Sequence, residues 1–88
     1  MPAKDSVDTE LRGIFVALKK KLPGADQRLL RLLHDPDAET RLSVVKAIHE
    51  KRWTAFAGRL AARLDEETDE TVRAALTAAC ADLGTVAS

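Results

Sequence analysis

Apolar residues recur at spacings of three and four positions along most of the chain, which is the pattern of amphipathic α-helices. Pro23-Gly24 interrupts the first run as a stop signal. No stretch shows the strict alternation that would predict a strand. The pattern predicts five helices, over about residues 6–21, 25–34 and 36–50, followed by one that carries Trp53 to Leu64 and one that carries Val72 to Leu83.

Polar caps and short connections separate these helices. Asp35 is suited to cap the third helix with Pro36 in its first turn, and Thr68 is suited to cap the fifth, which Gly84 would end. Helices joined by about two to five residues must lie antiparallel to their sequence neighbours. The chain is therefore expected to form a stack of helical hairpins.

A short segment recurs at the start of three helices. Asp35 to Arg41 opens the third helix, Glu67 to Arg73 opens the fifth, and Asp8 to Arg12 lies in the first. The period of about 30 residues is typical of stacked helical repeats. Such repeats bury their apolar stripes against one another and leave one extended face free, so the pattern favours a binding function.

The segment from Leu29 to Ile48, with Asp35-Pro36 and Thr40-Arg41 at its centre, resembles the HEAT and HEAT-like repeats, including the short bacterial type found in phycobilisome-lyase-like proteins. The resemblance implies an all-α fold: a five-helix α-solenoid of antiparallel helix hairpins with about two and a half repeats. It divides a single domain, residues 1–88, into an orphan helix at about 6–21, repeats at about 25–51 and 53–84, and a short tail, 85–88.

The resemblance also implies roles for a structural motif made of Asp35, Pro36, Arg12, Arg41 and Arg73. Asp35 would cap the turn between helices, and Arg41 and Arg73 would hydrogen-bond acids of adjacent repeats. We therefore expect Arg41 to be an intramolecular contact, near acids such as Asp35 and Asp37. Its replacement by Ala would then cost about 1–3 kcal/mol of stability, as for a charge-assisted hydrogen bond that loses its donor.

Equivalent positions of the first, third and fifth helices can be compared. The sets Leu11/Thr40/Val72, Ile14/Ser43/Ala75, Phe15/Val44/Leu76 and Leu18/Ala47/Ala79 resemble core positions. Other sets lie on the side that this family leaves open and concave. Most of their residues are small or apolar, at positions where a solvated face would carry charged residues. They predict a shallow groove for an amphipathic helix or extended peptide. The alternative is that Ala is present as a helix former. The predicted contacts are Leu42 at the centre, with Val45, Lys46, His49, Gly13, Ala17, Ala74 and Ala78.

The formal net charge is zero, but the charges are segregated along the chain. Bases dominate between Leu11 and Arg31, and acids dominate between Leu64 and Glu70. Such polarity can steer a partner or promote head-to-tail contact, although a basic run at a helix C-terminus also complements the helix dipole. The alternative function is nucleic-acid binding, which zero net charge disfavours; its contacts would be Lys19, Lys20, Lys21, Arg28, Arg31, Lys51 and Arg52.

Little in the sequence indicates catalysis. His34 and His49 are not paired with other ligand types at helical spacing, and Cys80 occupies an apolar position where a thiol behaves as a small hydrophobe. No phosphate-binding loop or nucleophile elbow is present. We therefore expect no enzyme activity, no metal and no cofactor. Trp53, the single tryptophan, is either a core residue or a binding anchor.

The N-terminus has no apolar run of signal-peptide length, and no stretch approaches about 18 consecutive apolar residues. We therefore expect a cytoplasmic protein with no membrane contact. Three functions are compatible with these features: an adaptor or scaffold that binds another protein on its concave face, a nucleic-acid-binding protein, and a structural subunit that forms a homo-oligomer through its terminal helices. The first is favoured.

Overall fold

The computed structural model describes residues 3–84, and the side chains of residues 7–84. Within this part of the chain there are only helices and connections, so the predicted all-α class is confirmed for the described residues. The elements are α1 (Ala3–Lys19), α2 (Ala25–Leu33), α3 (Ala38–Glu50), the 3₁₀ turn η1 (Thr54–Phe56), α4 (Ala57–Glu66) and α5 (Glu70–Leu83).

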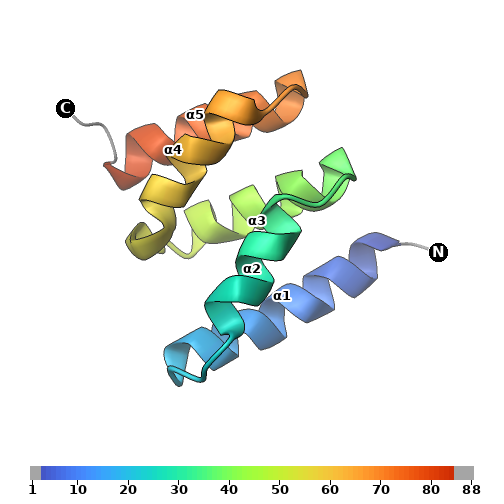
Figure 1. The fold of residues 1–88 in the computed structure, drawn as a ribbon, viewed down its shortest axis with the longest axis vertical. Coiled ribbons are helices and arrows are strands. Elements are labelled where there is room, and N and C mark those ends of the chain that lie inside the picture. Colours follow the sequence, from blue (N-terminus) through green and yellow to red (C-terminus); the bar gives the residue numbers. More distant parts are fainter. Residues whose placement is uncertain (1–2, 85–88) are drawn as a thin grey trace.

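The helices form two layers. In Figure 1, α1, α3 and α5 run in the same direction across the view, and α2 and α4 run back in front of them. α3 is the central helix, because it packs against α1, α2 and α5, whereas α4 packs on α5. The molecule measures 32 × 30 × 18 Å.

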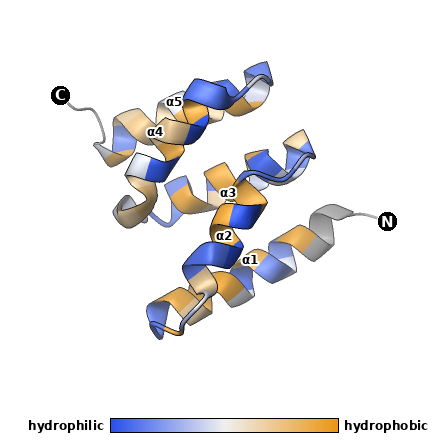
Figure 2. Cartoon of the chain, viewed as in Figure 1, coloured by the Kyte–Doolittle hydropathy of each residue, from blue (hydrophilic) through white to orange (hydrophobic). Residues whose placement is uncertain are grey.

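The core lies where the two layers meet. In Figure 2 each helix carries both hydrophobic and hydrophilic residues, as expected of amphipathic helices that bury one side. Two of the sets proposed as core positions are buried in all three helices, and the members of the other two are buried or half-buried. The largest fully buried side chains are Ile14, Leu29, Leu33, Ile48, Leu60, Leu76, Val44, Val45 and Val72.

The starts of α3 and α5 differ from the predicted caps by one or two residues. The N-cap of α3 is Asp37 rather than Asp35. Asp35 instead accepts a hydrogen bond from the backbone N–H of Asp37 (2.8 Å), which closes the turn before the helix. The N-cap of α5 is Asp69 rather than Thr68, and its carboxylate accepts from the backbone N–H of Val72 (3.0 Å). Asp69 thus caps α5 with its side chain, whereas the side chain of Asp37 accepts from the hydroxyl of Thr40 (3.1 Å) and from no backbone N–H of α3.

The C-terminal ends of α1 and α3 have the same geometry. Lys21 and Arg52 adopt left-handed backbone conformations (φ 59° and 53°), which glycine usually supplies. The next residue in each case, Leu22 or Trp53, donates its backbone N–H to a carbonyl five positions earlier (2.9 and 3.1 Å), as in a Schellman motif. α1 therefore ends at Lys19, earlier than predicted. α5 ends at Gly84 (φ 79°), as predicted.

The structure also bears on membrane insertion. Among the residues it describes, no helix is both long enough and apolar enough to cross a bilayer.

Candidate binding groove

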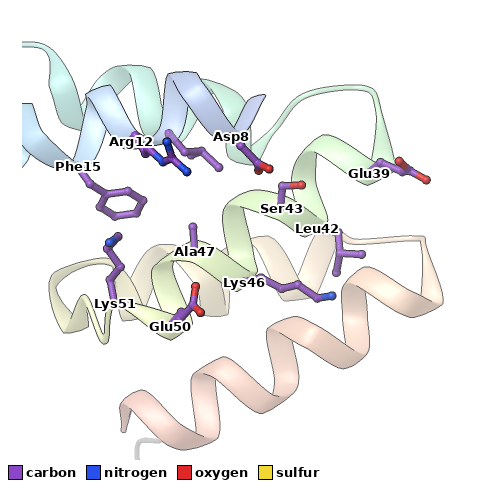
Figure 3. Close-up of a pocket in the computed structure, with 11 residues that line it drawn as sticks. Asp8, Arg12, Phe15, Glu39, Leu42, Ser43, Lys46, Ala47, Glu50 and Lys51 are labelled. Carbon is purple, nitrogen blue, oxygen red and sulfur yellow. The ribbon is translucent and has the colours of Figure 1, made fainter. Parts of the chain in front are cut away.

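A groove of about 460 Å³ lies between α1 and α3. Figure 3 shows the side chains that line it: Asp8, Leu11, Arg12 and Phe15 from α1, and Glu39, Leu42, Ser43, Lys46, Ala47, Glu50 and Lys51 from α3 and the residue after it. The two helices pack through their larger apolar residues, while Ser43 and Ala47 are too short to fill the space beside that contact. These two short side chains leave room for the groove on the α3 side.

The groove has an apolar base and a charged rim. Leu11 and Phe15 contribute buried apolar surface, and Leu42 is half-buried. The exposed residues around them are of both signs: Asp8, Arg12, Glu39, Lys46, Glu50 and Lys51. A surface of this kind combines apolar burial with charges that can orient a ligand.

Two of the predicted contacts line the groove, Leu42 and Lys46. Gly13 is exposed and Ala17 is half-buried on α1, but neither lines it. The remaining α5 positions predicted as contacts, Ala74 and Ala78, are exposed on a helix that contributes no residue to this groove. The predicted continuous face across three helices is therefore reduced to the space between α1 and α3.

Val45 was predicted to border the concave face, and this prediction is wrong. Its side chain is completely buried (0% exposed) and belongs to the hydrophobic core. Val16, at the equivalent position of α1, is 51% exposed. Val45 therefore cannot contact a partner unless the fold opens.

His49 contacts another helix rather than the groove. Its Nε2 lies 2.8 Å from Oδ2 of Asp82 on α5, and Arg52 donates to the same oxygen (3.1 Å). The hydrogen bond with His49, aided by the charge of Arg52, lowers the pKa of Asp82. A second hollow lies here, lined by Lys46, His49, Glu50, Arg52 and Asp82. This cluster ties the ends of α3 and α5 together at the surface.

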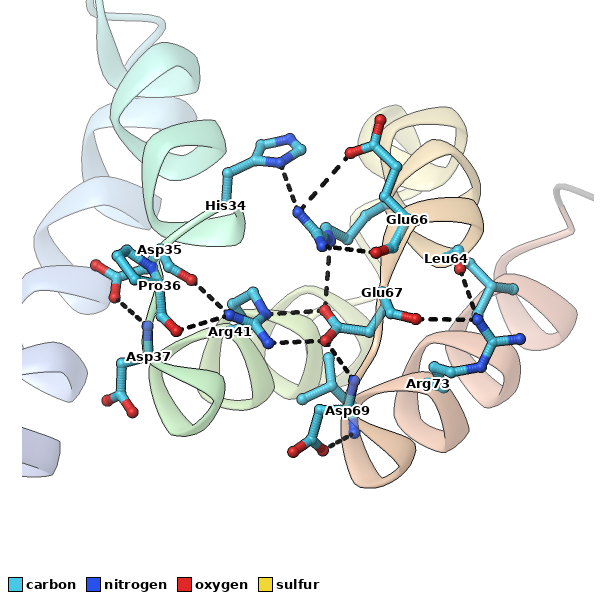
Figure 4. A network of polar contacts seen from close by, with 12 residues as sticks. His34, Asp35, Pro36, Asp37, Arg41, Leu64, Glu66, Glu67, Asp69 and Arg73 are labelled. Carbon is cyan, nitrogen blue, oxygen red and sulfur yellow. Dashed lines mark hydrogen bonds and ion pairs between the residues drawn. The ribbon is translucent and has the colours of Figure 1, made fainter.

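Arg41 forms the main buried polar contact of the fold, shown in Figure 4. Its Nε and Nη2 donate to the two carboxylate oxygens of Glu67 (2.9 and 2.8 Å), and its Nη1 donates to the backbone carbonyls of Asp35 and Pro36 (2.7 and 3.1 Å). Arg41 thus joins the turn before α3 to the turn before α5. The acid it contacts is Glu67, and not the side chains of Asp35 or Asp37.

The side chain of Glu67 is completely buried. Its carboxylate contacts the side chains of Arg41 and Arg63 and the backbone N–H of Asp69. Burial acts to raise the pKa of Glu67, but the hydrogen bond from Arg41, the N–H of Asp69 (3.0 Å) and the charges of Arg41 and Arg63 outweigh it, so the pKa is lowered. Hydrogen bonding to Glu67 raises the pKa of Arg41. The pair is therefore ionised, and each member depends on the other.

Arg63 completes this network from α4. Its Nε lies 3.3 Å from Glu67, and its Nη1 is 2.9 Å from Nδ1 of His34. Glu67 was named above only as the start of a repeated segment, and Arg63 was not predicted to have a role. Glu67 had a signal, because it occupies the repeat position of Asp35 with one more methylene, and that length lets it reach back to Arg41.

Arg73 differs from the role that the family resemblance implies. It donates to the backbone carbonyls of Leu64 and Glu67 (both 3.1 Å), not to an acid. Arg12, the third arginine of the motif, is exposed at the rim of the groove. The three arginines thus have three different environments.

The basic residues proposed for nucleic acid are divided between two places. Lys19, Lys20 and Lys21 at the end of α1, and Lys51 and Arg52 after α3, lie at the same edge of the molecule, on the left in Figure 1. Arg28 and Arg31 are exposed on α2, where Arg28 lies 3.8 Å from Glu10. None of the lysines at this edge has a carboxylate within ion-pair distance among the described residues.

Trp53 is half-buried beside α1. Its ring centroid lies 5.2 Å from that of Phe15 at an interplanar angle of 51°, and it packs against the core. The ammonium of Lys51 lies 5.7 Å from the centre of the same Phe15 ring. Cys80 is also half-buried against the core. Trp53 is therefore a packing residue at the junction between α1 and α3.

Within residues 7–84, no group of three or more His, Cys, Asp and Glu side chains is arranged to hold a metal ion. Comparisons with protein-family models, curated proteins and solved structures find no match to this chain. Any functional assignment therefore depends on the residues and their geometry.

Proposed function

We propose that this chain is a non-catalytic adaptor with a HEAT-like α-solenoid fold, and that it binds a helical or extended segment of another protein in the groove between α1 and α3. The observation that carries the proposal is the half-buried Leu42 beside an apolar base, inside a rim of both charge signs. The period of about 30 residues and the two-layer arrangement of the helices support the repeat assignment.

A peptide fits this groove better than a compact small molecule. Small-molecule sites enclose most of the ligand and present a few converging polar groups. Here the polar groups are spread along two helices, from Asp8 to Arg12 on one side and from Glu39 to Glu50 on the other. An elongated ligand can contact all of them, and an amphipathic helix lays its apolar side chains between such walls.

Leu42→Glu tests the proposal, with Leu22→Glu as the matched control. Both changes place a carboxylate on a partly exposed leucine, but Leu22 is 52% exposed and lies outside the groove. Peptides selected from a displayed library against the wild-type protein would be titrated by fluorescence anisotropy. Leu42→Glu should weaken their binding by about tenfold or more, as expected of a central apolar contact, while Leu22→Glu should leave it unchanged.

Thermal unfolding of both variants is the accompanying measurement. Leu42 is half-buried, so Leu42→Glu should lower the free energy of unfolding by about 1 kcal/mol and still leave a folded protein. Equal binding by wild type and a folded Leu42→Glu variant would refute the groove. Backbone amide shifts confined to α1 and α3 when peptide is added would identify the binding site directly.

A further inference from the structure

The connections between helices divide by charge between two opposite edges of the molecule. At the left edge in Figure 1, the connections after α1 and α3 carry the exposed bases Lys20, Lys21, Lys51 and Arg52, which we call the basic edge. At the right edge, the starts of α3 and α5 and the end of α4 carry the exposed acids Asp37, Glu39, Glu66 and Glu70, which we call the acidic edge. The segregation in sequence is therefore also a segregation in space.

The two edges are built in the same way, because each is formed by the ends of two neighbouring helices of one layer. The basic edge consists of two corners, at the ends of α1 and α3, and the acidic edge consists of two corners, at the starts of α3 and α5. In each case the corners belong to neighbouring helices of one layer, which lie about 8–10 Å apart when they pack directly. A second copy shifted by one helix would bring the end of α1 against the start of α3, and the end of α3 against the start of α5.

We propose that the basic edge binds the acidic edge of a second copy of this chain, head to tail. In this arrangement Lys20 and Lys21 face Asp37 and Glu39, and Lys51 faces Glu66 and Glu70. The formal net charge of zero means that no overall repulsion opposes the approach of two copies. When two copies bind in this way, the pair still has one free basic edge and one free acidic edge. Further copies can therefore add at both ends, and the contact builds open chains rather than a closed dimer.

A polyanion is a less suitable ligand for the basic edge. Asp82 pairs with Arg52 there (3.1 Å), and Glu50 is exposed at the end of α3, so phosphates would meet carboxylates as well as bases. Another copy presents a few separate acids instead of a continuous line of charge. The groove shares two rim residues with the edges, Glu39 with the acidic edge and Lys51 with the basic edge. The control variant described below therefore changes groove residues that belong to neither edge.

The test uses two charge-reversal variants with one substitution at each corner. Lys20→Glu with Lys51→Glu reverses the basic edge, and Glu39→Lys with Glu66→Lys reverses the acidic edge. None of these positions has a left-handed backbone. Arg12→Glu with Lys46→Glu is the control, because it changes the net charge as much as the basic-edge variant does but alters groove residues that belong to neither edge.

Sedimentation velocity at increasing protein concentration measures association. At about 0.01 M salt, where screening is weak, the wild type should associate, and at about 1 M salt it should be monomeric. Each edge variant alone should associate at least about tenfold more weakly, which corresponds to the loss of a few surface ion pairs. An equimolar mixture of the two variants should associate again, because their reversed edges are complementary. The groove control should behave as wild type.

Several outcomes would overturn the proposal: a monomeric wild type at low salt, association that the edge variants leave intact, association that the groove control abolishes, or a mixture that remains monomeric. A monomeric wild type that binds duplex DNA or anionic vesicles, and loses this binding in Lys20→Glu with Lys51→Glu, would assign the basic edge to a polyanion instead. Rescue by mixing cannot arise from misfolded variants, so it separates complementarity from damage to the fold.

Discussion

Replacing Arg41 by Ala removes the buried link between the turns before α3 and α5. The change deletes two charge-assisted hydrogen bonds to Glu67 and two bonds to the carbonyls of Asp35 and Pro36. Glu67 would remain with the N–H of Asp69 and with Arg63, whose Nε is 3.3 Å away. Its side chain is completely buried, so solvent cannot replace the lost partner.

The expected cost is about 3–5 kcal/mol, the range for removing one partner of a buried ion pair. This exceeds the 1–3 kcal/mol for an ordinary charge-assisted hydrogen bond because a buried carboxylate is left with only Arg63 and the N–H of Asp69 as partners. A domain of this size has a stability of roughly 5–12 kcal/mol, so Arg41→Ala should remain folded but with about half of its stability lost. Replacing the pair together, as Arg41→Met with Glu67→Leu, should recover much of the loss because no buried charge then remains.

Urea unfolding followed by circular dichroism measures these differences, with Arg73→Ala as the control. Arg73 is also an arginine at the start of a helix, but it is exposed and bonds only backbone carbonyls, so its loss should cost about 0.5–1.5 kcal/mol. If Arg41→Ala costs no more than Arg73→Ala, the buried pair does not stabilise the fold as we have reasoned.

The pH dependence gives a second check on the same pair. The pKa of Glu67 is lowered in the folded protein, so its stabilisation is present above the ordinary glutamate pKa and is lost as the pH falls through the lowered value. Without Arg41, the strongest of the contacts that lower this pKa is lost, so the pKa should be higher than in wild type and the carboxyl would take up a proton more readily. The stability difference between wild type and Arg41→Ala should therefore narrow between about pH 7 and about pH 4, and a constant difference would contradict this reasoning.

Two further predictions concern packing and backbone conformation. Val45→Ala should lower the free energy of unfolding by about 2–3 kcal/mol, since it removes two buried methyl groups and leaves a cavity. The control Val16→Ala should change the free energy of unfolding by no more than about 0.5 kcal/mol. Equal effects of the two changes in urea unfolding would contradict the burial of Val45. Lys21→Gly should be about 1–2 kcal/mol more stable than Lys20→Gly. Both changes remove one charge from the same helix end, but only Lys21 has the left-handed backbone that glycine adopts without strain. Equal midpoints of thermal unfolding for the two variants would contradict this.

The helices were predictable because their apolar spacing and their caps agree with each other. The exact ends of the helices were less predictable from the sequence. Two acids, Asp35 and Asp37, flank Pro36, and the sequence does not say that one closes the turn while the other caps α3. At the end of α1 the left-handed position is occupied by Lys21, so the usual glycine signal is missing and the helix was predicted too long.

The long-range polar contacts were only partly predictable. A repeated arginine suggested that Arg41 would be held within the fold, but its partner Glu67 lies in the connection between α4 and α5, 26 residues further along the chain. The choice of Glu67 depends on how the turns before α3 and α5 are brought together, and this is a property of helix packing and not of local sequence. Arg63, in contrast, lies four residues before Glu67, so its contact with Glu67 is a local one that the sequence spacing could have predicted.

The prediction that Val45 contacts a partner is wrong because α3 is the central helix of its layer. Comparing equivalent positions assumes that each helix has the same surroundings, yet α3 packs against α1, α2 and α5, while α1 and α5 lie at the two ends of their layer. A position that is exposed in the outer helices, at Val16 and Thr77, is therefore buried in α3. A groove can form on α3 only beside short side chains. Ser43 and Ala47 provide that space, which is why Leu42 and Lys46 are accessible to a partner and Val45 is not.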